Sequence, residues 1–250
     1  MAMMLQGGRA IYGYAIGILL FDGRRYPMAP GDVGNASSYG FPVRLKVVPG
    51  LLDCPLPPET WDAAQPPREV ELIIAAAREL EAEGVRAIVT CCGFFSVVQE
   101  VLAQAVRIPV FTSPLLLVPV LNRMFGGREI GILTASKQLL VEGYLRAAGI
   151  TAAHPIAIAG LEASSEFYAT HMGGTRTEMD LHKLRDEVVA IAVELVRERP
   201  GLAAIVLECT TLPSFAADIE AATGLPVFDY IAFVEFIRRS VSPRRYDGLV

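Results

Sequence analysis

Two stretches of the chain that repeat one another and end in cysteine decide the fold. Residues 84–92 read GVRAIVTCC and residues 201–209 read GLAAIVLEC, which pairs Cys92 with Cys209 at an offset of 117 residues (92 to 209). The match runs without a gap and ends in two thiols. It therefore predicts two similar halves of the molecule, each presenting one sulfur atom to a shared site.

The repeat extends beyond the cysteine segments. Further paired segments follow in the same order, namely 16–19 with 130–133, 68–83 with 184–199, and 108–111 with 225–228. The first pair reads Ile-Gly-Ile-Leu in both copies, and such an apolar run without alternation is typical of a buried strand. The second pair has the spacing of an amphipathic helix. Alternating strands and helices predict parallel sheets with right-handed crossovers. We therefore expect an α/β fold of two flavodoxin-like halves related by a pseudo-twofold axis, with the active site in the cleft between them.

The predicted halves are not contiguous in the chain. We place the first in residues 1–112 together with 229–250, and the second in residues 113–228. Two long segments, 21–67 and 161–180, break the repeat. Long loops in compact α/β proteins often form lids or binding walls, and a plain surface excursion is the alternative.

Composition excludes several classes of function. The chain has 250 residues and a net charge of −5, without a basic stripe, so we expect no nucleic-acid partner. The longest apolar stretch, 110–125, contains two prolines and an arginine and is too short to span a bilayer. Four cysteines without a secretion signal predict free thiols in a reducing cytoplasm.

The matched cysteines carry the expected chemistry. Cys92 and Cys209 each stand between the end of a predicted strand and the start of a predicted helix. The pKa of a thiol falls at a helix N-terminus. Backbone N–H groups from Gly93 and from Thr210 onward can hold a carboxylate there. One thiolate can remove the proton next to that carboxylate while the other thiol returns a proton from the opposite face. This predicts inversion of configuration without a metal or an organic cofactor.

The two motifs resemble those of a known superfamily. Val89-Thr90-Cys91-Cys92-Gly93-Phe94 and Val206-Leu207-Glu208-Cys209-Thr210-Thr211 are similar to motifs of the aspartate/glutamate racemase superfamily, which includes hydantoin racemases, maleate isomerases and arylmalonate decarboxylases. The resemblance implies a racemase or epimerase that acts next to a carboxylate or carbonyl of a small molecule. It also implies that Cys92 and Cys209 form the acid/base pair without pyridoxal phosphate, that Thr210 helps to bind the carboxylate, and that the chain can form a homo-oligomer.

Several polar or aromatic residues near the motifs are candidates for binding the substrate. They are Thr90, Gly93 and Phe94 around Cys92, Thr210 and Thr211 after Cys209, Thr134 and Ser136 after the second Ile-Gly-Ile-Leu segment, and Asn35 in the first long loop. Amino-acid racemases typically have Asn-Thr where this chain has Gly93-Phe94. Phe94 and Phe95 favour a more apolar pocket for a cyclic or larger substrate, and the alternative is that both phenylalanines pack beneath the helix.

The remaining reactive side chains need separate interpretations. Alternation along a strand puts Cys91 on the face opposite Cys92, which predicts a packing role for Cys91. Glu208 replaces the glycine that usually precedes the second cysteine. It either raises the pKa of Cys209 and keeps that thiol protonated, or lies solvated beyond the strand end. Cys54 has no repeat partner and is interpreted as incidental. The three histidines lack metal-ligand spacing, so no metal site is expected.

Two other hypotheses stay open. In the first, the same fold serves a cysteine-dependent isomerase or decarboxylase of the maleate isomerase or arylmalonate decarboxylase type. In the second, the chain is a non-catalytic homologue that binds a ligand.

Overall fold

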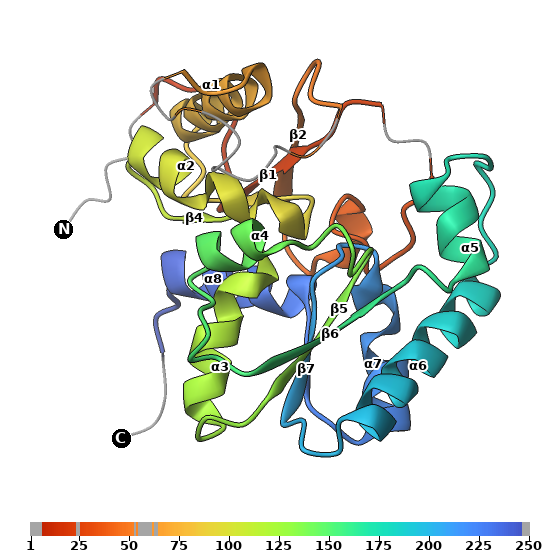
Figure 1. Ribbon diagram of the computed structural model, residues 1–250. Helices are drawn as coiled ribbons and strands as arrows, with labels where there is room; N and C mark the ends of the chain where they lie inside the picture. Colours follow the sequence, from red (N-terminus) through yellow and green to blue (C-terminus); the bar gives the residue numbers. More distant parts are fainter. Residues whose placement is uncertain (1–6, 24–25, 53, 55–61, 63–64, 247–250) are drawn as a thin grey trace.

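Two parallel sheets form the frame of the molecule. The computed structural model describes residues 7–23, 26–52, 54, 62 and 65–246. Within them the strands form one sheet ordered β2-β1-β3-β4 and another ordered β6-β5-β7-β8 (Figure 1). Both sheets have flanking helices and the same strand order. The predicted α/β architecture of two similar halves is therefore confirmed.

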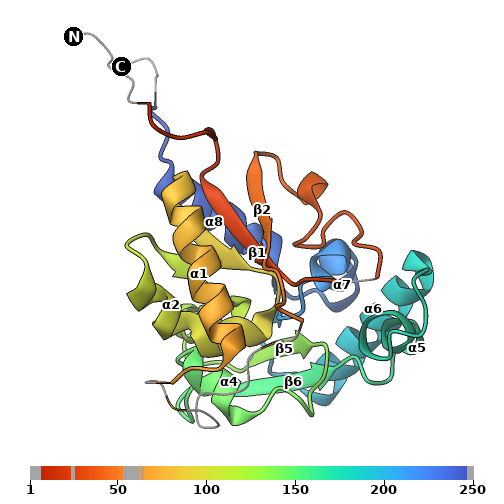
Figure 2. The ribbon, with the colours of Figure 1, turned by 90° about the horizontal axis from the view of Figure 1, so that it is seen from above.

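The first half is built around the sheet that contains β1. Its elements are β1 (Ile16–Leu20), η1 (Ala36–Ser38), β2 (Val43–Val47), α1 (Arg68–Glu83), β3 (Ala87–Thr90), η3 (Gly93–Val98), α2 (Gln99–Ala105) and β4 (Val110–Phe111). Helix α1 packs on β1 and β3 from one side. In Figure 2, α1 lies in front of this sheet and α8 lies behind it.

The second half repeats this plan. Its elements are η4 (Pro114–Leu117), α3 (Val118–Met124), β5 (Ile130–Thr134), α4 (Glu142–Ala147), β6 (Ile156–Gly160), α5 (Ser165–Phe167), η5 (Tyr168–Met172), α6 (Leu181–Glu198), β7 (Ala204–Leu207), η6 (Leu212–Phe215), α7 (Ala216–Thr223) and β8 (Val227–Phe228). Figure 1 shows α3 and α6 on opposite sides of this sheet, and both contact β5.

The repeated glycine explains why the Ile-Gly-Ile-Leu segment recurs. In the first half, Ile16 of β1 pairs with Ala87 of β3, and in the second, Ile130 of β5 pairs with Ala204 of β7. A Cβ atom on Gly17 would lie 2.9 Å from the side chain of Leu80 in α1. At Gly131 it would lie 3.3 Å from Leu195 in α6. The glycine thus lets a helix approach the central strand closely in each half.

The chain exchanges helices between the halves. Helix α8 (Tyr230–Val241) follows the last strand of the second sheet, yet it packs against β3 of the first. The Tyr230 hydroxyl donates a hydrogen bond of 2.9 Å to the carbonyl of Thr112. In the reverse direction, η4 follows β4 of the first sheet and contacts β7 of the second. The sheet of each half is therefore covered in part by a helix that follows the last strand of the other half in the sequence.

Both cysteine motifs lie at carboxyl ends of central strands. Strand β3 ends at Thr90, and Cys92 is the N-cap of η3. Strand β7 ends at Leu207, two residues before Cys209. Ligands of open parallel sheets bind at this edge. In the part of the chain that the structure describes, none of the helices combines the length and apolar character needed to cross a bilayer.

Candidate active site

Cys92 and Cys209 open into the same cavity. This cavity has a volume of about 530 Å³ and lies at the carboxyl ends of the central strands. Both cysteines are half-buried, and neither forms a disulfide bond within the described part of the chain. The structure thus brings together the two sulfur-bearing residues that the sequence repeat paired, one from each half.

A third thiol lies beside Cys92. The Sγ atom of Cys54 is 3.0 Å from the Sγ atom of Cys92, and Cys54 lines the cavity. The interpretation of Cys54 as incidental is therefore wrong. The two residues are 38 positions apart in the chain, and Cys54 comes from the long first loop, which has no counterpart in the repeat. Cys91, in contrast, is buried and accepts a hydrogen bond from the Phe21 N–H, which agrees with its predicted packing role.

The environment of Cys209 favours its protonated form. Burial raises the pKa of the Cys209 thiol well above its ordinary value, and the carboxyl group of Glu208 acts in the same direction. A hydrogen bond from the backbone N–H of Thr211 opposes this effect without cancelling it. At neutral pH, Cys209 therefore carries a proton in the resting site.

Glu208 lies inside the site. Its side chain is 1% exposed, and it lines the cavity together with both thiols. The hydroxyl of Thr134 donates a hydrogen bond of 2.7 Å to its Oε2 atom, while Oε1 has no hydrogen-bond partner in the part of the chain that the structure describes. Burial, followed by the nearby Cys92, raises the pKa of Glu208 to about 8, against hydrogen bonds from the Thr134 hydroxyl and the Ala135 backbone N–H. The alternative of a solvated carboxylate beyond the strand end is therefore wrong.

Gly93 provides the space that Glu208 occupies. A Cβ atom at position 93 would overlap Oε1 of Glu208 and lie 2.6 Å from the backbone oxygen of that residue. Gly93 is buried and begins η3 directly after Cys92. Its role in this structure is to let the chain that carries Cys92 approach the chain that carries Cys209.

We expect Gly93→Ala to destabilise the protein by about 1–3 kcal/mol, because the methyl group overpacks a buried contact with backbone. Urea unfolding followed by circular dichroism measures the change. Gly201→Ala is the matched control, since a Cβ atom there meets nothing within 4 Å. Equal stability of the two variants would contradict the close approach of Gly93 to Glu208.

Aromatic side chains form much of the cavity wall. They are Phe21, Tyr26, Phe94, Tyr144 and Phe167. Phe94 stacks on Tyr144 with 4.8 Å between ring centroids, and both rings line the cavity. Phe94 therefore contributes to an apolar pocket, as predicted. The same prediction is wrong for Phe95, which is fully buried and stacks on Phe21 instead of lining the cavity.

Both long loops contribute to the wall. The first supplies Tyr26, and the second supplies Phe167 and His171, whose ring lies between the other two, with centroids 3.9 Å from Tyr26 and 4.4 Å from Phe167. Nε2 of His171 lies 3.2 Å from the hydroxyl of Thr211. Arg176 also lines the cavity and forms an ion pair with the buried Glu166. The prediction that these loops form binding walls is met by these residues.

Of the predicted binding residues, Phe94 and Thr210 line the cavity, and the others form its support. Thr134 holds Glu208, as described above. Thr211 donates a hydrogen bond of 2.9 Å to Oδ2 of Asp32, a buried carboxyl from the first loop. Sequence reasoning missed Asp32, because it stands in a Pro-Gly-Asp turn that is typical of surface loops.

Three further predicted binding residues bond elsewhere. The Thr90 hydroxyl donates a 2.6 Å hydrogen bond to the Thr112 carbonyl and is fully buried. Ser136 donates one of 2.9 Å to Glu162. Asn35 caps η1 by accepting a hydrogen bond from the N–H of Ser37. None of these three side chains lines the cavity. Their hydrogen bonds stabilise the end of β3, the turn after β5 and the first loop, respectively.

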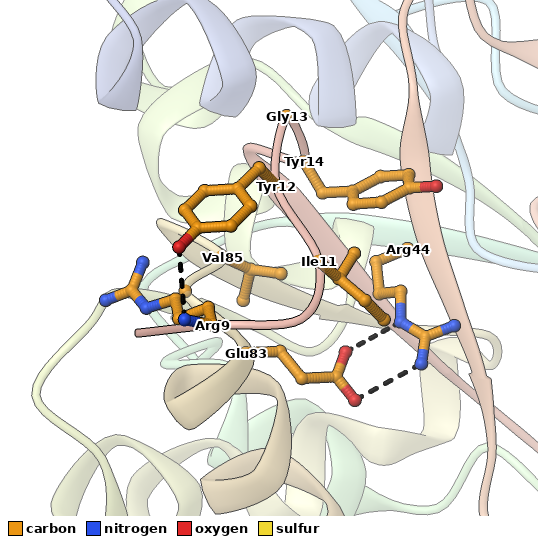
Figure 3. Close-up of a pocket in the computed structure, with 9 residues that line it drawn as sticks. Arg9, Ile11, Tyr12, Gly13, Tyr14, Arg44, Glu83 and Val85 are labelled. Atoms are coloured by element: carbon orange, nitrogen blue, oxygen red, sulfur yellow. Dashed lines mark hydrogen bonds and ion pairs between the residues drawn. The ribbon is translucent and has the colours of Figure 1, made fainter. Parts of the chain in front are cut away.

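A second hollow lies at the opposite edge of the first sheet. Figure 3 shows it between the segment that precedes β1, with Arg9 and Tyr12, and the end of α1. Its volume is only about 50 Å³. Nε of Arg44 and Oε2 of Glu83 lie 2.6 Å apart in an ion pair across it (Figure 3). This hollow lies at the amino ends of the strands, away from the thiols. Among the described residues, no group of three or more His, Cys, Asp or Glu side chains could hold a metal ion.

Comparisons with known proteins agree with this arrangement. The sequence profile of the family described as Asp/Glu/hydantoin racemase matches residues 47–234. An allantoin racemase from Klebsiella pneumoniae superimposes with a TM-score of 0.59 at 15% identity, over 90% of this chain and 87% of that one. At this identity the structural likeness concerns the fold alone.

Curated relatives at higher identity carry the name of a lyase. A dimethylsulfoniopropionate lyase of Durusdinium sp. clade D is 31% identical over 232 residues, which is 90% of this chain and 74% of that protein. Dimethylsulfoniopropionate lyase 5 of Emiliania huxleyi is 33% identical over 89% of this chain, which spans only 44% of that protein. The paired thiols, the duplicated sheets and the profile match lead to one conclusion: this chain belongs to the Asp/Glu/hydantoin racemase family.

Proposed function

We propose that this protein is a lyase that removes the proton next to the carboxylate of a β-sulfonio carboxylic acid, with dimethylsulfoniopropionate as its substrate. The observation that carries this proposal is a pair of thiols, Cys92 and Cys209, that line one aromatic-walled cavity. The identity to dimethylsulfoniopropionate lyases over 90% of the chain supports the choice of substrate.

The reaction needs one base and no acid for the leaving group. Cys92, as the thiolate, takes the α proton, and the electrons of the C–H bond form the double bond between the α and β carbons. The bond between the β carbon and sulfur breaks, and its electrons leave with dimethyl sulfide. The products are acrylate, dimethyl sulfide and a proton on Cys92 that passes to solvent. We assign the base to Cys92 because burial and Glu208 keep Cys209 protonated.

The cavity suits the two ends of such a substrate. Sulfonium ions, like quaternary ammonium ions, are attracted to the faces of aromatic rings. Phe94, Tyr144 and Tyr26 supply such faces. Thr210 lines the cavity beside Cys209 and provides a hydroxyl for the carboxylate. The thiol proton of Cys209 stabilises the negative charge that develops next to the carboxylate in the transition state.

The direct test incubates the purified protein with dimethylsulfoniopropionate. Gas chromatography of the headspace measures dimethyl sulfide, and liquid chromatography measures acrylate. We expect both products in equal amounts. If the protein binds dimethylsulfoniopropionate but forms neither dimethyl sulfide nor acrylate, the lyase activity is excluded.

A racemase or epimerase is the second candidate, and the matched placement of Cys92 and Cys209 at equivalent strand ends favours it. Two opposed thiols are what inversion at a carbon next to a carboxylate requires. Incubation of chiral amino acids and hydantoins in heavy water distinguishes it from the lyase. A racemase incorporates deuterium at the α carbon and inverts it, without releasing a leaving group.

If the aromatic wall binds a sulfonium group, Phe94→Leu will raise KM for dimethylsulfoniopropionate about tenfold, which corresponds to the loss of one cation–π contact. The value of kcat will change less, because the wall does not touch the α proton. Steady-state kinetics give both constants. Phe236→Leu is the control, since Phe236 is 62% exposed on α8 and does not line this cavity. An unchanged KM would argue against sulfonium binding at Phe94.

A further inference from the structure

Glu208 is the one carboxyl group among the described residues that line the cavity. Glu208 occupies the position in the second copy of the repeat that Cys91 occupies in the first, so the two halves differ here. Strand β7 ends at Leu207, and both Glu208 and Cys209 line the cavity. A carboxyl group has therefore been placed beside two thiols that are expected to handle protons.

The contacts of Glu208 show which of its oxygen atoms can carry a proton. Oε2 accepts the hydrogen bond from Thr134, and the backbone N–H of Ala135 also donates to this carboxyl group, so a proton on Oε2 would compete with a donor that is already in place. Oε1 is buried, has no hydrogen-bond partner among the described residues, and lies against Gly93, the residue that directly follows Cys92. An ionised carboxylate in this position would leave a buried charged oxygen without a donor, which costs several kcal/mol.

The groups that interact with Glu208 and the thiols are mostly acids. They are Cys54 from the first loop, whose sulfur lies 3.0 Å from that of Cys92, Cys92 from the start of η3, Tyr230 from α8, Cys209 from the turn after β7, and Asp32 from the first loop through Cys209. A second negative charge among these groups is unfavourable in a low-dielectric site. Hence an ionised Glu208 and a Cys92 thiolate oppose one another. A neutral Glu208 removes this conflict.

We propose that Glu208 is a positioning acid for Cys92: it keeps a proton on Oε1 at neutral pH, and this neutral carboxyl allows the Cys92 sulfur to carry the negative charge of the base. In the reaction, the thiolate of Cys92 takes the α proton while Glu208 retains its own. This inference rests on the proposed function only in naming Cys92 as the base.

The ionisation of Cys92 can be measured without any substrate. Iodoacetamide alkylates the thiolate, and peptide mass spectrometry after timed quenching gives a rate for each cysteine between pH 6 and pH 10. At pH 9, where Glu208 is ionised in the native protein, we expect Cys92 of Glu208→Gln to react about tenfold faster than in the native protein. At pH 6.5, where the native Glu208 keeps its proton and is as neutral as the glutamine that replaces it, the two alkylation rates should agree within about twofold.

Two further variants sharpen the test. Glu129→Gln is the control, because Glu129 forms an ion pair with Arg199 at the amino end of β5 and should leave the pH dependence unchanged. Thr134→Val removes the hydrogen bond that lowers the pKa of Glu208 and should move the effect to higher pH, even if Glu208→Gln folds poorly. Equal pH dependence of Cys92 alkylation in the native protein and both site variants would overturn the proposal.

The enzymatic readout separates this inference from the proposed function. If the lyase is confirmed, kcat/KM of the native protein should fall above about pH 8, and this fall should be absent in Glu208→Gln. If no dimethyl sulfide is formed, the alkylation rates still decide the state of Glu208. A Glu208→Gln variant that is inactive at every pH, with slow alkylation of Cys92 throughout, would show that Glu208 itself serves as an ionised base.

Discussion

Cys92→Ala will lower kcat/KM for dimethylsulfoniopropionate about 1000-fold, because removal of a positioned general base costs two to four orders of magnitude. Cys209→Ala will lower it at least about 100-fold, the usual loss when one donor to a developing negative charge is removed. The loss should be smaller at Cys209 because its proton stabilises the transition state rather than taking part in the bond that breaks.

Headspace gas chromatography under steady-state conditions measures these changes. Cys91→Ala is the matched control: Cys91 is adjacent to Cys92, yet it is buried on the other side and receives a hydrogen bond from Phe21 instead of lining the cavity. We expect it to retain activity within about tenfold, consistent with a packing role. If Cys92→Ala kept full activity while Cys91→Ala lost it, the assignment of the thiols would be reversed.

Glu208→Gln will stabilise the protein by about 3 kcal/mol at pH 7, because the native chain must protonate a carboxyl with an ordinary pKa of 4.5 to bury it. The folded state holds this proton up to about pH 8, whereas the unfolded state releases it near pH 4.5. The folded state thus binds more protons in this window. The free energy of unfolding of the native protein therefore falls as pH rises from about 4.5 to about 8, and the Glu208→Gln variant lacks this fall.

Urea unfolding at pH 5 and pH 8 tests this expectation. The advantage of Glu208→Gln should be small at pH 5 and grow towards pH 8. Glu166→Gln gives the opposite sign, because the hydrogen bond from Arg176 lowers the pKa of Glu166, which is equally buried. That variant should be destabilised at neutral pH and approach the native protein as pH falls through the lowered pKa. A stability advantage of Glu208→Gln that did not change with pH would contradict a neutral Glu208.

The repeat made the fold predictable, because its signals are local. An apolar run with a glycine at its second position reports a strand that a helix approaches closely, and it occurs at Gly17 and again at Gly131. The thiol pair followed from the same register. Neither inference required knowledge of contacts between residues that are distant in the chain.

The parts of the site that escaped prediction depend on such distant contacts. Alternation correctly separated Cys91 from Cys92, since the N–H of Phe21 contacts the buried Cys91. Glu208 occupies the position equivalent to Cys91, one residue beyond the end of its strand, yet it lines the cavity together with Cys209. Alternation therefore held after β3 and failed after β7, where both residues face the same cavity. Cys54 reaches Cys92 from a loop without periodicity, and no local pattern reports that encounter.

The polar candidates differ for a related reason. Hydroxyl residues at strand ends serve ligands and backbone equally well, so sequence position does not distinguish the two uses. The Thr90 hydroxyl donates a hydrogen bond to the backbone carbonyl of Thr112, whereas Thr210 lines the cavity. Asn35 follows glycine in a turn, where its side chain caps η1.

The exchange of helices between the halves also governs how the protein is made. Synthesis proceeds from the amino end, and domains generally fold as their sequence emerges from the ribosome. Strand β3 ends at Thr90, but α8, which packs against it, begins only at Tyr230. The first sheet thus stays partly uncovered while the whole second half is translated. Apolar surface that is exposed during such an interval is prone to aggregation, so the late arrival of α8 lengthens the period in which the nascent chain is vulnerable.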